Sequence, residues 1–262
     1  MDFHERVLSL RRSRRRFAIC TVVETSGSSP RKSGAKMIVL FEGGQVGTIG
    51  GGAIEYEVVA QARQALEAGE SRLVRRHLTH ELAMCCGGGM SVFVEVQSYD
   101  PRLYLFGCGH VGLALGRMAA GCGFEVKAID PRPEYAEAGR FEGVSGSLEV
   151  ICDDPLEVIE GLAFEAEGTY AVVATHDHGL DEAIVARLLG RELRYLGCIG
   201  SERKGLKFRQ RLEARGFSAE AVSRMRTPMG LPIGALTPEE IAVSVLAELI
   251  AERRGGGRLE SR

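Results

Sequence analysis

The segment Gly107-Cys108-Gly109-His110-Val111-Gly112 has the residue types and spacing needed to hold a phosphate. It lies between the apolar run 103–106 and a helical pattern, the context in which a G-x-G-x-x-G sequence binds a dinucleotide. There Gly107 permits a tight turn, Gly109 lets a pyrophosphate approach the backbone, and Gly112 lets helix and strand pack closely. Amides and the dipole at the helix start then attract the anion. We therefore predict a site for a phosphate-bearing ligand here.

Further polar residues follow later strand patterns, and parallel strands end at one common crevice. Asp130 stands 23 residues after Gly107, where an acid usually meets a ribose hydroxyl. His176 and His178 together could ligate a metal, but no matching third ligand is evident. Helix capping or a hydrogen bond to the ligand is the other interpretation of these histidines. Arg203 fits a phosphate contact or a solvated helix charge equally well.

The elements that must position these residues alternate regularly in the second part of the chain. Strands are predicted at 103–106, 125–129, 170–174 and 194–199, with helices at 110–120, 180–189 and 202–214. A last helix has Thr237 as its cap, Pro238 at its first position and Glu240 at its third, ahead of the apolar run 241–250. Alternating strands and helices predict an α/β, Rossmann-type domain, a parallel sheet with helices on both faces.

The first part of the chain mixes strands with one good helix. Strands are predicted at 17–23, 36–41, 45–49, 72–78 and 91–96, and a helix at 53–68. Gly50-Gly51-Gly52 precedes this helix and Gly69 stops it. Turn formers at 98–101 mark the best domain boundary. We predict a smaller α+β domain over residues 1–100 and the Rossmann-type domain over 101–262.

Composition narrows the class of protein. The chain has 262 residues, 26% of them charged, and a net charge of -2. No stretch approaches the roughly 18 apolar residues of a membrane helix, and the charged N-terminus does not resemble a signal peptide. We therefore expect a cytoplasmic protein that binds neither membranes nor nucleic acid; the arginine run 11–16 is interpreted as a solvated helix end. Seven cysteines without a C-x-x-C sequence indicate thiols, and Cys108, Cys122 and Cys198 are expected in the core.

Several common chemistries are absent from the sequence. None of the six tyrosines has a lysine four residues later, and no Gly-Lys pair or G-x-S-x-G sequence occurs. A Rossmann-type domain without a recognisable catalytic set favours binding over turnover. An NAD(P)-dependent oxidoreductase and a nucleotide-sensing regulatory protein are the two alternatives, the first lacking an identifiable proton donor.

Motifs spread over the chain, from about Ala18 to Glu248, resemble those of the XdhC family in type and order. They are 22–31, 47–52, 84–88, 106–112, 175–178 and 232–242. Members of this family are accessory proteins of xanthine dehydrogenase and related molybdenum hydroxylases. Many carry a cysteine after the triple glycine, where this chain has Ala53. That departure weakens any scheme in which cysteines of both glycine loops hold the metal.

The resemblance implies a chaperone for the molybdenum cofactor (molybdopterin) rather than an enzyme. Such a protein protects the cofactor while an oxo ligand is exchanged for sulfur, then delivers it to the apo-hydroxylase. Its partners would be apo xanthine dehydrogenase or a related hydroxylase of purine catabolism, and a cysteine desulfurase. The form of the cofactor, mononucleotide or dinucleotide, and the oligomeric state, a homodimer included, are left open.

The residues expected to hold this cargo come from three loops. Phosphate needs amide donors, which Gly107–Gly112 with His110 supplies and Gly50, Gly51 and Gly52 could supply at their own helix start. Molybdenum–sulfur chemistry suits a thiolate, and Cys86 is expected to be open because Gly87 and Gly88 follow it. Cys86 is therefore the predicted metal ligand. A plain tight turn at Gly50–Gly52 and a buried structural pair at Cys85 and Cys86 are the alternatives.

Overall fold

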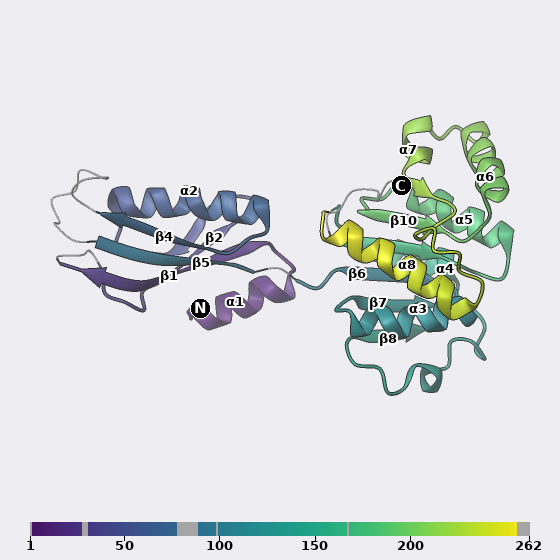
Figure 1. Cartoon of the computed structure of the whole chain (residues 1–262), viewed down its shortest axis with the longest axis horizontal. Helices are drawn as coiled ribbons and strands as arrows, with labels where there is room; N and C mark the ends of the chain where they lie inside the picture. Colours follow the sequence, from purple (N-terminus) through teal and green to yellow (C-terminus); the bar gives the residue numbers. More distant parts are fainter. Residues whose placement is uncertain (1, 28–30, 78–88, 98, 167, 256–262) are drawn as a thin grey trace. The chain divides into compact units, whose positions relative to one another are not determined.

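The computed structural model describes residues 2–27, 31–77, 89–97, 99–166 and 168–255. Contacts divide the chain into two compact units, Met1–Tyr99 and Asp100–Arg262 (Figure 1). Within the described residues, no helix is both long and apolar enough to cross a membrane.

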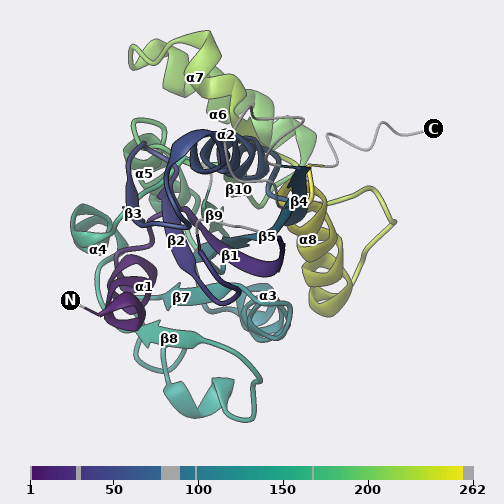
Figure 2. The ribbon, with the colours of Figure 1, turned by 90° about the vertical axis from the view of Figure 1, so that its left-hand side faces the viewer.

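The first unit is a five-stranded antiparallel sheet covered by two helices. Its strands lie in the order β3-β2-β1-β5-β4. The elements are α1 (Phe3–Arg12), β1 (Phe17–Ser26), β2 (Lys36–Leu40), β3 (Gln45–Gly47), α2 (Gly52–Ala68), β4 (Arg72–His77) and β5 (Gly89–Gln97). Figure 2 shows α2 and α1 on opposite sides of this sheet.

Each helix of this unit buries one apolar stripe. Ile54, Val58 and Ala62 of α2 recur at every fourth position and pack against Val22 and Val92 of the sheet, as expected for an amphipathic helix. On the opposite face, Leu10 of α1 joins a smaller cluster with Phe17, Ile38 and Leu40. The α+β expectation for this part of the chain matches the observed sheet and helices.

The second unit is a six-stranded parallel sheet in the order β11-β10-β9-β6-β7-β8. Counted along the chain this is the order 3-2-1-4-5-6 read in reverse, the arrangement of the classical dinucleotide-binding fold. The elements are β6 (Arg102–Phe106), α3 (His110–Gly121), β7 (Glu125–Ile129), the 3₁₀ helix η1 (Ala138–Phe141), β8 (Leu148–Ile151), α4 (Pro155–Gly161), β9 (Thr169–Val173), α5 (His178–Leu188), β10 (Tyr195–Cys198), α6 (Glu202–Ala214), α7 (Ala219–Ser223), β11 (Met225–Arg226) and α8 (Pro238–Arg253). The predicted fold class is confirmed.

Two apolar layers enclose this sheet. One packs Leu115 of α3 and Val245 of α8 against Leu103 and Leu105 of β6. The other packs Ile184 of α5 and further residues of α6 against the opposite face. Because β6 and β9 are covered on both sides, they are continuous apolar runs rather than alternating ones.

Five elements of this unit were not predicted from the sequence: η1, β8, α4, α7 and β11. β8 and β11 are only four and two residues long. The connection from β7 to β8 contains a 3₁₀ turn, η1, in place of the usual crossover helix. That departure leaves a long irregular segment beside the end of β7, next to the glycine loop.

Candidate functional site

The three glycines of the loop after β6 differ in what surrounds them. Gly107 has φ +108°, and a Cβ built there would lie 2.2 Å from the Ala174 carbonyl oxygen. A Cβ on Gly112 would lie 1.9 Å from the Gly107 oxygen. A Cβ on Gly109 would meet no atom within 4 Å. Gly107 and Gly112 are therefore required by packing, whereas Gly109 borders open space.

The start of α3 leaves its amides without side-chain partners. Its N-cap is Gly109, and the first backbone bond of the helix runs from Leu113 N to Gly109 O at 2.8 Å. The amides of the preceding residues, His110 included, thus have no intrahelical acceptor. The other α-helices described in this unit all carry a side-chain cap: Asp154, Asp177, Ser201, Ser218 and Thr237. An anion is the natural partner for this uncapped helix start.

Asp130 fixes the glycine loop after β6 through a hydrogen bond to its backbone. Its carboxylate is 1% exposed and accepts hydrogen bonds from Cys108 N at 2.8 Å and from Arg132 Nε at 2.9 Å and Nη2 at 2.8 Å. Burial opposes ionisation, but these donors outweigh it and lower the pKa of Asp130. Both carboxylate oxygens are therefore engaged, and any ribose hydroxyl at Asp130 would share it with Arg132.

A second arginine meets the loop from the irregular segment after β7. Arg140 Nη1 donates to Cys108 O at 2.9 Å and to Tyr135 O at 2.6 Å. The Arg132 guanidinium stacks over the Tyr135 ring, 3.8 Å from its centroid. Sequence reasoning missed Arg132 and Arg140, although two arginines follow the predicted ribose-binding acid within ten residues. They place two cations beside the uncapped helix start.

The polar residues after β9 and β10 are joined by a buried acid. Thr175 Oγ1 donates to Asp181 Oδ1 at 2.6 Å, and Lys204 Nζ lies 2.9 Å from Asp181 Oδ2. His178 Nδ1 is 3.6 Å from the same carboxylate. These contacts connect the loops after the two strands at the carboxyl edge of the sheet.

The remaining predicted residues at this edge are exposed. His176 lies outside the Asp181 cluster, and Asp177 beside it caps α5, accepting from Leu180 N at 2.7 Å. Arg203 is exposed in the first turn of α6. Across the residues that the structure describes, no three His, Cys, Asp or Glu side chains are grouped as a metal site.

A groove of about 530 Å³ adjoins the glycine loop at His110. Leu113 and Met118 of α3 form one wall, and Glu239 and Val243 of α8 form the other. Both helices begin at this groove, because His110 and Pro238 are their first residues. The groove combines apolar walls with the charged side chains of Arg117, Glu239 and Glu240.

The second glycine loop, in the first unit, is closed by its own chain. Glu55 Oε2 accepts from Ile49 N and Gly51 N, both at 3.0 Å, and from the Thr48 hydroxyl. The Gly50 amide donates to Thr48 Oγ1 at 3.0 Å. Partial burial of Glu55 opposes ionisation, but these donors prevail and lower its pKa. Glu55 thus binds the Gly51 amide and Thr48 binds the Gly50 amide, two of the donors that the sequence assigned to phosphate.

Several strand ends next to the first-unit motifs lie at one end of the antiparallel sheet. Ser26 pairs with Gly89, His77 pairs with Gly89, and Gly47 pairs with Met37 near the start of β2. The strand ends leading into the triple glycine and the segment 78–88 are consequently at the same end. Cys86, Gly87 and Gly88 themselves lie outside the described residues. A cavity of about 410 Å³ borders Gly52 and the side chain of Tyr56, which is 82% exposed.

The described cysteines divide into buried and exposed thiols. Cys108 and Cys198 are buried as expected, and burial raises the pKa of each to about 12. Cys122 was wrongly expected in the core: it is exposed, because it lies beyond the last turn of α3 as its C-cap.

The chain matches two family models. The model described as the XdhC Rossmann domain matches residues 103–249, and the one described as the XdhC and CoxI family matches residues 10–77. A crystal structure described as a xanthine dehydrogenase from Bacillus halodurans is 23% identical, with a TM-score of 0.53, and covers 100% of this chain and 98% of that one. At that identity it supports the fold alone.

Three relatives extend the comparison. An uncharacterized protein of Escherichia coli, YqeB, is 35% identical over 89% of this chain and 43% of its own length. A protein of Bacillus subtilis named as a probable xanthine dehydrogenase subunit is 33% identical over 63% of this chain and 46% of its own length. The molybdenum cofactor insertion chaperone PaoD of Escherichia coli is 26% identical over 90% of this chain and 83% of its own length. The chain spans about half the length of the first two.

Proposed function

Because the chain belongs to the XdhC family, we propose that it is an accessory protein that binds the molybdenum cofactor as cargo. It protects the cofactor during sulfuration and delivers it to xanthine dehydrogenase or a related molybdenum hydroxylase. The names of two relatives, a cofactor insertion chaperone and a probable dehydrogenase component, support this role. One observation of the structure carries the proposal: the uncapped start of α3 beneath Gly109, flanked by two arginines.

The phosphate end of the cofactor is assigned to this helix start. A phosphate beside Gly109 accepts hydrogen bonds from the first amides of α3, and no side chain at that glycine blocks its approach. Arg132 uses its Nε and Nη2 on Asp130, and Arg140 uses its Nη1 on two carbonyls. Each keeps at least one guanidinium nitrogen outside these bonds, and charge-assisted bonds to phosphate are stronger than neutral ones.

The pterin ring is assigned to the groove between α3 and α8. His110 belongs to both the helix start and the groove, so one ligand can extend from the first to the second. A pterin is a flat ring whose N–H edge needs acceptors, and Glu239 in the lining of the groove offers a carboxylate. Leu113 and Met118 supply apolar and polarizable contacts to its faces.

We propose Cys86, which lies outside the described residues, as the ligand of the metal. Thiolates suit molybdenum–sulfur chemistry, whereas the buried thiols of Cys20, Cys108 and Cys198 have pKa values raised to about 12 and stay protonated. Cys86→Ser should lose bound molybdenum while keeping its melting temperature, and Cys85→Ser should do the reverse. Equal molybdenum in Cys86→Ser and the unaltered protein after gel filtration would show that this thiol is not a ligand.

Delivery requires two partners: a cysteine desulfurase that supplies sulfur and an apo-hydroxylase that takes the cofactor. Asp130, the acid of a nicotinamide site, is already held by Arg132. An oxidoreductase or a nucleotide sensor therefore has less support than a carrier. Binding of NADPH together with no binding of molybdenum cofactor would instead favour an oxidoreductase or a nucleotide sensor over a carrier.

The test is direct loading. Purified protein is incubated with isolated molybdenum cofactor, and molybdenum and visible absorbance are measured after gel filtration. We expect about one molybdenum per chain, no oxidation of xanthine by the protein alone, and increased activity of cofactor-free hydroxylase when the loaded protein is added. Failure to retain molybdenum, or steady xanthine oxidation by the isolated protein, would contradict the proposal.

A further inference from the structure

One face of the antiparallel sheet in the first unit is covered over only part of its area. On the face opposite to α2, the α1 helix packs Leu10 against Phe17, Ile38 and Leu40. Figure 1 shows α1 beside only one end of this sheet. Toward the other end, the described elements of the first unit leave this face open.

Three large apolar side chains are exposed on the open part of this face. Val23 of β1 is 47% exposed, Leu73 of β4 is 43% exposed and Phe93 of β5 is 38% exposed. Their neighbours in each strand point to the other face and pack beneath α2, as Val92 does. Leu73 lies directly opposite Phe93 in the β4–β5 ladder. Because β4, β5 and β1 are adjacent strands, the three side chains form one apolar patch.

Two opposite charges flank this patch. Arg75 of β4 and Glu24 of β1 are each paired with Ser91 of β5, one from either side. The ladder is irregular between Val22 and Glu24, and the Ser91 hydroxyl donates to Glu24 Oε2 at 3.5 Å, which is long for such a bond. Both charged residues are exposed, and the Arg75 guanidinium makes no bond or ion pair with another described residue. A cation and an anion therefore stand one strand away from β5 on opposite sides.

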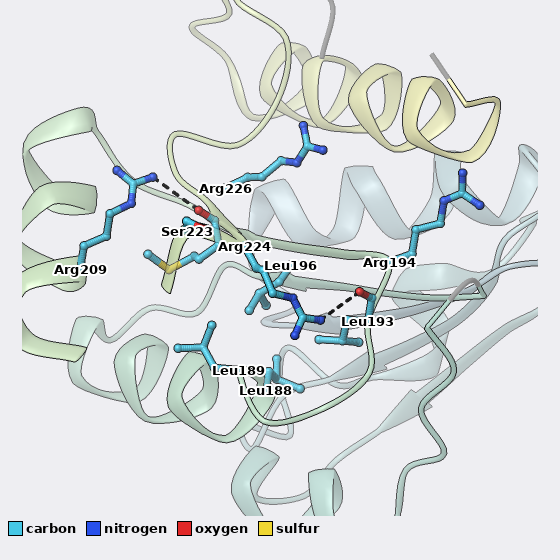
Figure 3. Close-up of a pocket in the computed structure, with 10 residues that line it drawn as sticks. Leu188, Leu189, Leu193, Arg194, Leu196, Arg209, Ser223, Arg224 and Arg226 are labelled. Atoms are coloured by element: carbon cyan, nitrogen blue, oxygen red, sulfur yellow. Dashed lines mark hydrogen bonds between the residues drawn. The ribbon is translucent and has the colours of Figure 1, made fainter. Parts of the chain in front are cut away.

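The arginines of the second unit are used differently. Four of them line a cavity of about 350 Å³ (Figure 3). Arg224 donates to Leu193 O at 3.2 Å, whereas Arg226 extends toward α8. Figure 3 shows Arg209 and Arg224 directed away from each other, toward different segments. These guanidinium groups offer no common point to a ligand, whereas the charge of Arg75 is open to a partner.

The open face is complementary to itself under a two-fold rotation. In a two-fold dimer the same surface is used twice, so that if residue i contacts residue j, then j contacts i. An axis parallel to β5 and above its open face places β4 of one copy over β1 of the other. Arg75 of each copy then faces Glu24 of the other, and Phe93 faces its own counterpart. Two ion pairs thus flank a central aromatic contact.

We propose that this face binds a second copy of the chain, forming a two-fold homodimer through the first unit. Phe93 is the central apolar anchor, in the position where interface energy is concentrated. The two Arg75–Glu24 pairs fix the orientation, because charge complementarity specifies register more than it adds affinity. A uniformly acidic or basic partner would match only one of the two charges, whereas a second copy matches both. The proposal uses no residue assigned to the cofactor.

The experiment measures the mass of the full chain by light scattering over a dilution series, without added cofactor. We expect a reversible dimer. Arg75→Glu and Glu24→Arg should each raise the dissociation constant at least tenfold, because each brings like charges together twice. Phe93→Thr should also raise it, since it removes the central contact but keeps a strand-forming residue. Arg72→Glu makes the same charge change on the α2 side of β4, so this matched control should leave the constant unchanged.

Mixing the two single-charge variants separates a contact between copies from an effect on folding. A pair of one Arg75→Glu chain and one Glu24→Arg chain has opposite charges at both contacts. The mixture should therefore recover the dimer that neither variant forms alone. Thermal melts show which variants fold, and if Phe93→Thr does not, the two exposed charge variants decide. A monomeric unaltered protein, a dimer that Arg75→Glu does not weaken, or no recovery on mixing would each overturn the proposal.

Discussion

The two glycine loops precede helices in the same way, yet one is open and the other is closed. The α3 loop has no side-chain cap, and Gly109 borders open space. The α2 loop also has no cap at Gly51, but Glu55 in the first turn of α2 accepts from the amides of Ile49 and Gly51. The comparison shows that a glycine-rich helix start is only a potential anion site. What matters is whether the chain already supplies the anion.

The largest expected effect on stability concerns Gly112, the last glycine of the α3 loop. Gly112→Ala places a Cβ 1.9 Å from the Gly107 carbonyl oxygen, which is backbone and cannot move cheaply. We expect a loss of stability above about 4 kcal/mol, in the range reserved for severe core damage. Urea unfolding measures it. A Gly112→Ala protein within about 1 kcal/mol of the parent would show that helix and loop pack less tightly than described.

The next effect concerns the acid that holds the open loop. Asp130→Asn removes the charge that pairs with Arg132 and weakens the acceptor for Cys108 N. Because the site is buried, we expect a loss of about 3 kcal/mol. Glu134→Gln, an exposed acid in the same segment, is the control and should change stability by less than about 0.5 kcal/mol. Equal losses of unfolding free energy in the two variants would show that the Asp130 contacts stabilise the fold no more than an exposed charge does.

A smaller effect is expected at the closed loop. Glu55→Gln loses charge-assisted bonds from Gly51 N and Ile49 N and should cost about 1–2 kcal/mol in the unfolding free energy. If the loop is closed only by this carboxylate, Glu55→Ala should also raise its affinity for inorganic phosphate. Unchanged phosphate binding in a folded Glu55→Ala protein would show that the loop is a turn and not a latent anion site.

The closed loop also has a pH signature. Its donors lower the pKa of Glu55 below the ordinary 4.5, so this contribution to stability is fully present above pH 4.5. It is lost as the pH falls through the lowered pKa, when the carboxylate takes up a proton. The difference in unfolding free energy between the parent and Glu55→Gln should therefore narrow below pH 4.5. A difference independent of pH would assign the effect to packing.

Sequence patterns predicted the open loop well because its signal is local. The apolar run before Gly107 and the spacing to Gly112 identify strand, turn and helix together. The cap and proline of α8 likewise identify its start at Pro238. Asp154-Pro155 carries the same signal for α4, which the prediction overlooked.

Other features depend on side-chain directions that spacing does not reveal. Nothing in the position of Asp130 indicates that Arg132 folds back onto its carboxylate. The turn of Glu55 onto the triple glycine is also invisible in the pattern, although an acid in the first helical turn hints at it. β8 and β11 were missed because a strand of four or two residues is too short to show an alternation of apolar and polar residues. The prediction for Cys86 stands outside the described residues and stays a prediction.

The most direct measurement of the central claim uses the one glycine of the open loop that packing does not need. Gly109 has φ -63° and no atom within 4 Å of a built Cβ, so Gly109→Val should fold normally and block the approach of a phosphate. Gly161→Val, at another open glycine of the same unit, is the control. Molybdenum retained after gel filtration is compared for both variants and the parent protein. We predict at least tenfold less in Gly109→Val, with unchanged retention in Gly161→Val and equal melting temperatures. Full retention by a folded Gly109→Val protein would contradict the assignment of the cofactor phosphate to this helix start.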